Sequence, residues 1–598
     1  MRREITEMRL IATMLLLGVA PLTNPQALAE PAPKRAAAQE LGQIIDDHWA
    51  GWLRENPIAA SALGERGYDT DLPDLSLAAQ DRAAANAKAL LDRLLAVDDT
   101  GLTETDRANK GVLARMLREQ VESTAFGQRM MLFTTYDNPH QSFAGLSNNL
   151  PFHRAADYRN YLVRLAKFPT MNSQIIAITH RAAAQGFVQP CEAMAGFAAT
   201  IDGAVAGPAE QTRFYAPFTR AKPADATPDE WREMQDEARR LITDVIAPEY
   251  HRFTAFYTRD YAPKCARKVG ASFLPNGKAY YAFQARVHTT TQLTPDQIHQ
   301  IGLEEVQRIA SRMEAVATAA GYANRQAMIA KLRRDPQYYA PSPEALMAAA
   351  ARQAKLIDGK LPAYFGKLPR LPYGIKAIPA ETAETTTTAY YSSGALTAGI
   401  AGFYYVNTSK LDQRPLFELP ALTAHEAVPG HHLQGALQQE IDLPNFRKHA
   451  AWFTAYGEGW GLYAEHLGEE MGLYDTPEKM MGRLSYDMWR ACRLVVDTGM
   501  HAKGWTKAQA IQFMTDNSAL SAANIEAEVN RYISWPGQAL GYKIGEIKIR
   551  ELRTKAENAL GAKFDLRRFH DAVLAQGAVP LDVLEAAIDR WISAEEKS

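Results

Sequence analysis

Clear helix-start signals constrain the fold of this chain more than any other feature. The segments Thr-Pro-Asp-Glu at 227–230 and Thr-Pro-Asp-Gln at 294–297 place a threonine before a proline and end on an acid or amide; Thr-Pro-Glu at 476–478 resembles them. Such a threonine caps free backbone N–H groups, and proline suits the first helical position because its missing N–H needs no partner there. These segments predict well-defined helices.

Apolar residues recur at helical spacing after these starts. Behind Thr294 they follow at Ile298, Ile301, Val306 and Ile309, which gives one apolar stripe on a helix. Similar stripes run through 76–96, 342–360, 476–503 and 535–554. The length of 598 residues allows a large core and more than one subdomain. We expect a mainly α protein with a helical N-terminal subdomain at 30–270 and a second subdomain at 271–598, because proline and glycine cluster around 265–290.

One stretch departs from the helical pattern. Residues 377–407 are rich in Thr, Tyr, Gly and Ser, and they include the run Ile-Ala-Gly-Phe-Tyr-Tyr-Val at 400–406. β-branched and aromatic residues bounded by Gly and Asn are typical of short strands. We therefore expect a small β element just before the histidine-rich segment that begins at His425.

The N-terminus carries a targeting signal. Basic residues at 2, 3 and 9 flank an apolar run at 10–19, and Ala-Leu-Ala at 27–29 supplies a cleavage site. This order predicts a secretory signal peptide at 1–29 and a periplasmic or secreted protein, with an uncleaved N-terminal anchor as the alternative. The run is short for a transmembrane helix, and no later stretch is long and apolar enough for one. No cysteine lies near the cleavage site, so we expect no lipid anchor there.

Charge and cysteine content limit the remaining classes. Lys and Arg total 66 against 68 Asp and Glu, and this balance offers no basic surface for nucleic acid. Three cysteines are too few for a disulfide scaffold or a cysteine-ligated zinc site. Cys191 and Cys265 either pair in an oxidising compartment or stay free, whereas Cys492 is expected to be a buried thiol in an apolar helix.

The segment His-Glu-Ala-Val-Pro-Gly-His-His at 425–432 is the strongest chemical signal. In the pattern His-Glu-x-x-His, two histidines on one helical face bind zinc and the glutamate acts as general base. In a regular helix, His432 would return to the face of His425 only about 10 Å along the axis, too far to share one ion. Pro429 and Gly430 favour a bulge that makes His431 the equivalent of the second histidine. We therefore prefer His431 to His432 as a zinc ligand beside His425.

A zinc site of this type needs a third ligand and an open position for water. Glu458 is the best candidate, because it lies in Tyr-Gly-Glu-Gly-Trp at 456–460, far enough beyond His431 for a second helix to return antiparallel. Glu465 could orient a ligand histidine from behind. Solvated helix faces and structural histidines are the alternatives, but three histidines within eight residues favour a metal.

The motifs His-Glu-Ala-x-Pro-Gly-His-His-Leu-Gln and Gly-Glu-Gly-Trp-x-Leu-Tyr-Ala-Glu resemble the DUF885 family, which is similar to gluzincin metallopeptidases. The stretches 489–501 and 531–545 also match it, and the resemblance is most specific between 370 and 550. It implies a large, mostly helical, oligopeptidase-like fold with a deep cleft. It also implies that the position of His431 is the regular histidine. The substrates of the family are poorly defined.

Several residues are candidates for catalysis or substrate binding. Glu426 is expected to move the proton of zinc-bound water to the leaving amine. Tyr542, Tyr532 and His501 could each donate a hydrogen bond to the oxyanion, or each could be a packed structural group. Arg531 either holds a substrate carboxylate or forms an internal ion pair.

The strand around Gly402 and Tyr404 either pairs with an extended peptide or belongs to a buried hairpin. Together these features predict an exported zinc peptidase that cleaves short peptides. A zinc amidase on other amides and a non-catalytic peptide-binding protein are the alternatives, and the intact Glu426 counts against the last. The oligomeric state cannot be predicted from these patterns.

Overall fold

The computed structural model describes residues 32–597 apart from 136, 149, 385, 397 and 398. The signal peptide expected at 1–29 lies outside the described residues. Within the described part of the chain, no helix combines the length and the apolar character needed to cross a bilayer.

The chain is mainly helical with one small sheet, as the sequence predicted. The strands are β1 (Tyr373–Ala377), β2 (Ala389–Ser392) and β3 (Gly402–Val406). The α-helices are α1 (Ala32–Glu55), α2 (Pro57–Ala62), α3 (Leu77–Ala96), α4 (Glu104–Ser123), α5 (Pro139–Ala144), α6 (Ala155–Ala184), α7 (Phe197–Gly203), α8 (Pro228–Leu241), α9 (Ala247–Phe256), α10 (Gly277–Thr289), α11 (Pro295–Ala319), α12 (Arg325–Arg334), α13 (Pro343–Asp358), α14 (Ala380–Ala383), α15 (Leu419–Glu426), α16 (His431–Glu440), α17 (Asn445–His449), α18 (Thr454–Glu470), α19 (Pro477–His501), α20 (Lys507–Asn517), α21 (Ala522–Ser534), α22 (Gly541–Leu560), α23 (Leu566–Leu574) and α24 (Leu581–Lys597).

The predicted helix starts are confirmed. Helix α8 begins directly after Thr227 and α11 directly after Thr294, and in both the threonine forms a reciprocal capping box with the third helical residue. Helix α19 follows Thr476, whose side chain accepts a hydrogen bond from the backbone N–H of Lys479. Capping of this kind satisfies N–H groups that have no partner inside the helix.

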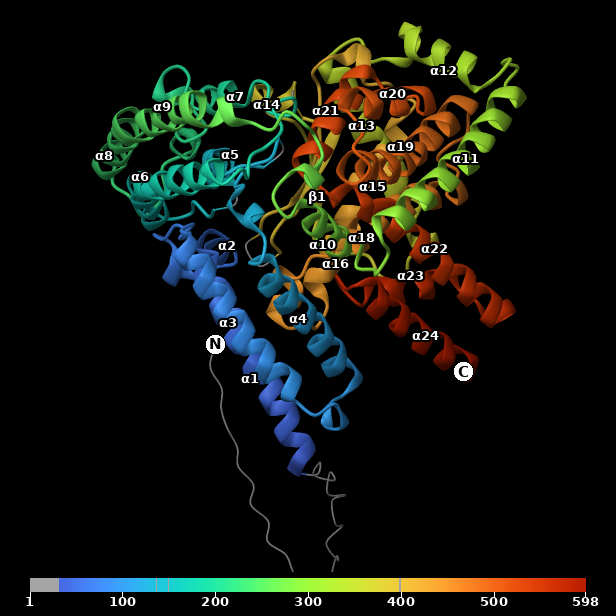
Figure 1. Ribbon diagram of the computed structural model, residues 1–598, viewed down its shortest axis with the longest axis horizontal. Helices are drawn as coiled ribbons and strands as arrows, with labels where there is room; N and C mark the ends of the chain where they lie inside the picture. The colour runs from blue at the N-terminus through green and yellow to red at the C-terminus, as the bar shows by residue number, and fades with distance from the viewer. Residues whose placement is uncertain (1–31, 136, 149, 385, 397–398, 598) are drawn as a thin grey trace, which may run out of the picture.

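Buried hydrophobic residues form a smaller and a larger core, besides a small cluster of Met130, Ile178 and Ala182. The smaller core is built from residues 133–261, whose helices α5–α9 form a lobe at the upper left of Figure 1. The larger core contains residues of α10 and the elements after it, and also residues of α1, α3 and α4. The segment expected at 30–270 therefore contributes to both cores. Periodicity identifies which face of a helix is apolar, but it does not say which partner buries that face.

The sheet has the order β1-β3-β2, with β3 parallel to β1 and antiparallel to β2. Tyr404 pairs with Ile375 on one side and with Tyr391 on the other. Because β3 is the central strand, both of its edges are occupied. The expectation that Gly402 and Tyr404 pair with a peptide is therefore wrong, and Tyr404 is a fully buried core residue.

Helices α18 and α22 approach closely at small residues. A Cβ atom on Gly459 would lie 2.6 Å from the backbone of Gly545, and one on Gly545 would lie 1.8 Å from the carbonyl oxygen of Ala455. Only glycine permits this contact between the two backbones. The close approach brings Glu458 of α18 near Tyr542 of α22, which is how two distant segments reach one site.

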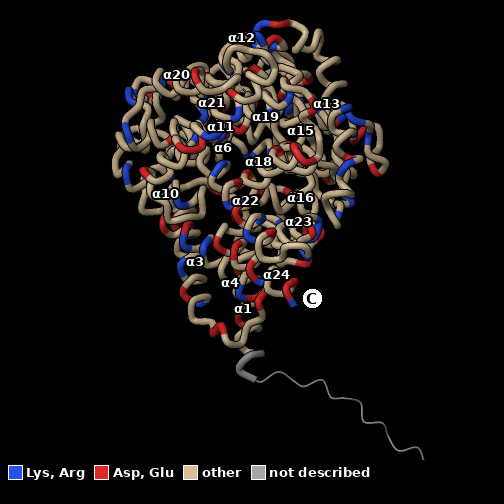
Figure 2. Tube along the Cα trace, turned by 90° about the vertical axis from the view of Figure 1, so that its right-hand side faces the viewer, with Lys and Arg blue, Asp and Glu red and all other residues tan. Residues whose placement is uncertain are grey.

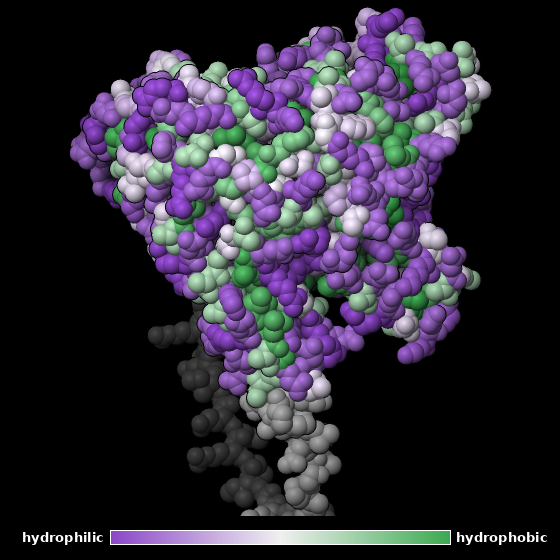
Figure 3. Space-filling model, viewed as in Figure 1, coloured by the Kyte–Doolittle hydropathy of each residue, from purple (hydrophilic) through white to green (hydrophobic). Residues whose placement is uncertain are grey.

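Cys191 and Cys265 form a disulfide, with 5.0 Å between their Cα atoms. Cys492 is a buried free thiol, as expected. Lys and Arg are interspersed with Asp and Glu along the trace (Figure 2), and hydrophilic and apolar residues are mixed over the face drawn in Figure 3. These surfaces agree with the balanced charge of the sequence.

Candidate metal centre

The histidine-rich segment is broken between its two outer histidines. Helix α15 ends at Glu426 and α16 begins at His431, so residues 427–430 form a connection between two helices instead of a bulge within one. The backbone N–H of His432 donates to the carbonyl oxygen of Ala427 across this connection, at 3.0 Å. The break removes the axial separation of a regular helix and places the His425 and His431 rings 4.7 Å apart.

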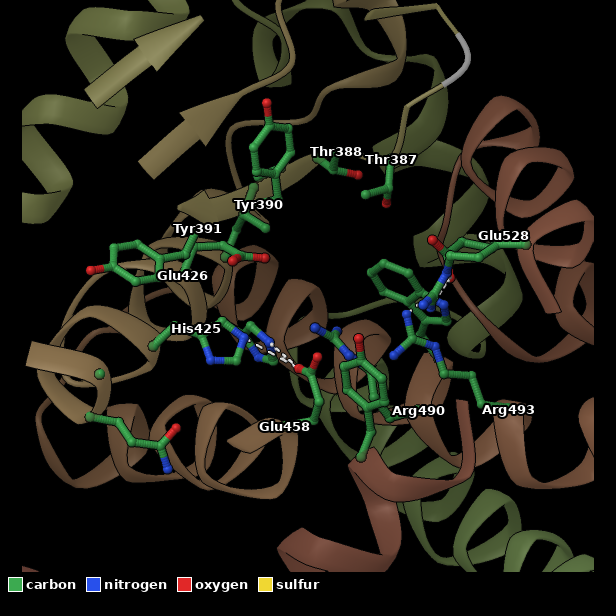
Figure 4. Close-up of a pocket in the computed structure, with 18 of the residues that line it drawn as sticks. Thr387, Thr388, Tyr390, Tyr391, His425, Glu426, Glu458, Arg490, Arg493 and Glu528 are labelled. Atoms are coloured by element: carbon green, nitrogen blue, oxygen red, sulfur yellow. Dashed lines mark hydrogen bonds and ion pairs between the residues drawn. The ribbon is translucent and has the colours of Figure 1, made fainter. Parts of the chain in front are cut away.

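His425, His431 and Glu458 converge on one point, and we call them the His–Glu cluster. Oε2 of Glu458 lies 3.5 Å from Nε2 of His425 and 3.2 Å from Nε2 of His431 (Figure 4). One ligand atom from each residue lies within 4.8 Å of the other two. Glu458 comes from α18, so two separate parts of the chain supply the three groups.

The His–Glu cluster fits a zinc ion. Two ligands that each lie about 2.0–2.2 Å from a tetrahedral zinc are roughly 3.3–3.6 Å apart, close to the two N···O separations measured here. The local charges also favour a cation. Burial raises the pKa of Glu458, but the neighbouring His431 and His425 outweigh burial and hold this pKa well below its usual value. Burial opposes a charge on His425, yet its hydrogen bonds to Glu458 and Glu465 raise its pKa to about 9.

His432 points away from the His–Glu cluster. Its Nδ1 lies 3.0 Å from the hydroxyl oxygen of Tyr391, and its Nε2 lies 3.0 Å from the carbonyl oxygen of Leu371. Burial lowers the pKa of His432 to about 4, so the ring is neutral at pH 7. The structure therefore brings His431, and not His432, to His425.

Two features hold His425 in place. Glu465 accepts a hydrogen bond from Nδ1 of His425 at 2.8 Å, and this leaves Nε2 directed at Glu458. Gly461 provides the space for the ring, because a Cβ atom there would lie 2.7 Å from Cε1 of His425. The sequence reasoning proposed Glu465 for this position but missed Gly461, although the glycine spacing in 456–461 was a visible signal.

Glu426 and Tyr542 line the same pocket as the His–Glu cluster. The ring of Tyr542 is nearly parallel to that of His425, with 6.3 Å between centroids. Burial, helped by the negative charge of Glu458, raises the pKa of Tyr542, so its hydroxyl keeps the proton and can donate a hydrogen bond. Glu426 projects toward the cavity beside His425 in Figure 4.

The other two predicted oxyanion donors are not in this pocket. His501 is completely buried, where its Nδ1 accepts from the backbone N–H of Ala271 and its Nε2 donates to the carbonyl oxygen of Tyr532. The hydroxyl of Tyr532 accepts hydrogen bonds from Trp489 and Arg493, both at 2.8 Å. Both predictions are corrected, because hydrogen bonds among α19, α21 and the segment before α10 commit these side chains to structural contacts.

Arg531 lines the pocket, but it forms an internal ion pair, which was the alternative to binding a substrate carboxylate. Its Nη2 lies 2.9 Å from Oε2 of Glu528, and its Nη1 donates to Oε1 of Gln538 at 2.6 Å. Sequence reasoning missed the other charged groups of the pocket, which are Arg490, Arg493 and Glu528. The two arginines lie in the stretch 489–501 that carried part of the family resemblance.

A family profile described as bacterial protein of unknown function (DUF885) matches residues 57–588. The chain belongs to the DUF885 family. A search of curated proteins found no match for it.

Two of the solved structures that resemble this DUF885 protein are described as lipoproteins. A presumed lipoprotein from Colwellia psychrerythraea is 29% identical with a TM-score of 0.86, over 94% of this chain and 99% of the other. A presumed lipoprotein of unknown function from Shewanella oneidensis is 19% identical with a TM-score of 0.63, over 92% and 99%. The second likeness concerns the fold alone.

Proposed function

We propose that this DUF885 protein is a zinc-dependent peptidase acting on short peptides. The observation that carries the proposal is the convergence of His425, His431 and Glu458 in a pocket that also contains Glu426 and Tyr542. Two imidazoles and one carboxylate are the ligand set of many catalytic zinc sites, in which the remaining position holds water. This ligand set is the basis for likening the protein to gluzincins and oligopeptidases.

Each side chain of the site has a definite task in hydrolysis. When bound, zinc would polarise the scissile carbonyl and lower the pKa of water. Glu426 accepts the proton of the attacking water and delivers it to the leaving amine. The Tyr542 hydroxyl donates to the oxygen of the carbonyl as negative charge develops there. Glu465 fixes the orientation of His425 and keeps its Nε2 toward the metal position.

The edge strand β2 supplies a place for the peptide backbone. Residues 387–391 line the pocket, and β2 pairs with β3 on one side only among the described residues. Figure 4 places Tyr390, Thr388 and Thr387 along one side of the cavity. A peptide in extended conformation can add to such an edge through main-chain hydrogen bonds. In our proposal β2 thus takes the role first expected of β3.

We further propose that the protein is exported. The disulfide between Cys191 and Cys265 is typical of oxidising compartments, and the sequence at 1–29 has the pattern of a signal peptide. The two similar structures are described as presumed lipoproteins.

The proposal is tested by measuring zinc content and hydrolysis of a defined peptide mixture by mass spectrometry. We expect a chelator to abolish hydrolysis and added zinc to restore it. Glu426→Gln should retain zinc but lose activity by a factor of about 10²–10⁴, the usual contribution of a general base. Glu440→Gln, on α16 but outside the pocket, is the matched control and should remain active.

Three results would point elsewhere. Unchanged turnover of Glu426→Gln would remove this residue from catalysis. Cleavage of other amides without any peptide hydrolysis would favour the zinc amidase. Peptide binding without any hydrolysis would favour a non-catalytic binding protein.

A further inference from the structure

One wall of the pocket is positively charged, and it extends from beside the His–Glu cluster to the far side of the cavity. Arg490 and Arg493 of α19 and Arg531 of α21 line it, and we call these three residues the basic wall. Figure 4 places Arg493 and Glu528 across the cavity from His425 and Glu458. A substrate that fills the cavity would therefore reach from the metal position to these arginines.

The basic wall holds more positive charge than its ion-pair partners neutralise. Arg490 pairs with Glu465 at 2.8 Å, while Arg493 and Arg531 share Glu528, each at 2.9 Å. Three guanidinium groups thus pair with two carboxylates. A ligand with a negative charge would balance the excess.

Arg493 has a donor that no protein group uses. Its Nε donates to Tyr532 and its Nη2 to Glu528, but its buried Nη1 has no hydrogen-bond partner among the described residues. The side chain is only 3% exposed and lines the pocket. Its guanidinium lies between the rings of Trp489 and Tyr542, at 4.5 and 4.0 Å from their centroids. A buried charged donor without a partner is costly, so this rigid group is prepared for an acceptor from a ligand.

Arg531 does not offer the same opportunity. Its Nε and Nη2 face Glu528, and its Nη1 donates to Gln538. Its contacts hold Glu528 in position beside Arg493.

We propose that Arg493, supported by Arg490, binds the C-terminal carboxylate of the substrate and makes the protein a carboxypeptidase. The inference rests on the proposed peptidase function. Both sites are close to the ring of Tyr542, whose centroid is 6.3 Å from that of the His425 ring and 4.0 Å from Arg493 Cζ. One residue of extended peptide spans about 3.3–3.6 Å, so a chain anchored at Arg493 presents a bond near its C-terminus to the His–Glu cluster. The products would then be short C-terminal fragments.

The experiment compares three versions of one peptide with the wild-type enzyme: a free C-terminal acid, a C-terminal amide, and an amide whose last residue is Glu. We expect kcat/KM for the free acid to exceed that for the plain amide by about 10- to 100-fold, since hydrogen bonds to a charged group are worth this much. Equal rates for acid and amide would overturn the proposal. Rapid cleavage of the amide that ends in Glu would also overturn it, because the basic wall would then bind an acidic side chain instead of the C-terminal carboxylate.

Arg493→Lys tests the residue itself. Lysine keeps a positive charge near Glu528 but lacks the planar guanidinium group. The ratio of kcat/KM for the acid peptide to that for the amide peptide should therefore fall to about one. Arg483→Lys is the matched control, because Arg483 is equally buried on α19 and pairs with Asp487 outside the pocket. Its preference should equal that of the wild type. An unchanged preference in Arg493→Lys would contradict the assignment. If this variant does not fold, the comparison of the three peptides with the wild-type enzyme still tests the carboxylate site.

Calorimetry on the zinc-loaded Glu426→Gln variant separates this inference from the proposed function. We expect it to bind the acid peptide more tightly than the amide by a similar factor, with no turnover needed. If the zinc-loaded wild type hydrolyses no peptide while the Glu426→Gln variant shows this binding preference, the peptidase is rejected but the carboxylate site is kept. Equal affinities would reject the carboxylate site alone.

Discussion

Oε1 of Glu465 lies 2.8 Å from Nδ1 of His425, and the same oxygen lies 2.8 Å from Nη2 of Arg490. A single buried carboxylate thus connects the His–Glu cluster to the basic wall. It fixes which nitrogen of His425 faces the metal position, and it also neutralises one arginine of the pocket. The orientation of the cluster and the charge of the basic wall are therefore coupled.

Glu465→Gln should weaken zinc binding by about 10- to 100-fold, because the amide holds the His425 ring less firmly and makes its nitrogen less basic. The measurement is competition with a chelator of known affinity. Glu470→Gln, also on α18 but paired with Arg553 at the surface, should bind zinc as the wild type does. Equal zinc affinity in Glu465→Gln would show that the carboxylate does not tune the site.

His431→Ala should affect zinc binding, whereas His432→Ala should affect stability. His431→Ala should lose zinc, since one of three converging ligand atoms is removed. His432→Ala should keep zinc but lose roughly 1–3 kcal/mol of unfolding free energy, because the Leu371 carbonyl loses its partner. Zinc analysis and urea unfolding of both variants provide the test. Loss of zinc only in His432→Ala would reverse the assignment.

Tyr542→Phe should reduce kcat by about 10²–10³-fold with little change in KM, because the hydroxyl contributes mainly when charge develops on the carbonyl oxygen. Steady-state kinetics on one peptide would measure both constants. Tyr463→Phe removes a buried hydroxyl that contacts His570 outside the pocket, and it should leave kcat unchanged. A rise in KM with unchanged kcat for Tyr542→Phe would argue against this role, because the hydroxyl would then contribute only to substrate binding.

The stability of the protein should fall as pH decreases from about 6.5 to 4, in part because of His501. Burial lowers the pKa of His501 to about 4, below the value near 6.5 expected for the unfolded chain. The unfolded state therefore binds more protons in this range, and acid favours unfolding. One such proton contributes up to about 1.4 kcal/mol per pH unit. Urea unfolding at several pH values should give a smaller pH slope for His501→Gln, and an equal slope would exclude His501 as a contributor.

Removal of the disulfide should lower the unfolding free energy by about 2–4 kcal/mol, since the bond closes a loop across a sequence separation of 74. A Cys191→Ala/Cys265→Ala protein should unfold at lower urea concentration than the wild type, and a reductant should not affect it further. Cys492→Ala should retain the sensitivity to reductant. A wild-type midpoint that does not respond to reductant would contradict the prediction.

Much of the candidate site could be predicted because its signals are local in sequence. The residues around Pro429 ruled out a regular helix through 425–432, and this favoured His431 over His432. The spacing from His431 to Glu458 allowed a return helix, and the structure has that helix as α18. The roles of the donors were harder to predict. Tyr542, Tyr532 and His501 all occur in stretches that resemble the family, yet only Tyr542 lines the pocket.

The helix starts and the small β element follow from the residues alone, because capping and periodicity act over one or two turns of chain. The spacing of His425, His431 and Glu458 indicated that they could meet, and the packing of α15, α16 and α18 brings them to one point. Tertiary packing, in contrast, set the strand order that leaves β2 at an edge of the sheet, and it left Nη1 of Arg493 without a hydrogen-bond partner among the described residues. Strand order depends on pairing between β1, β2 and β3, and the state of Arg493 depends on Glu528 and Tyr532 from another helix. Such long-range contacts leave no regular pattern in the residues next to them, so they are fixed only when the helices pack.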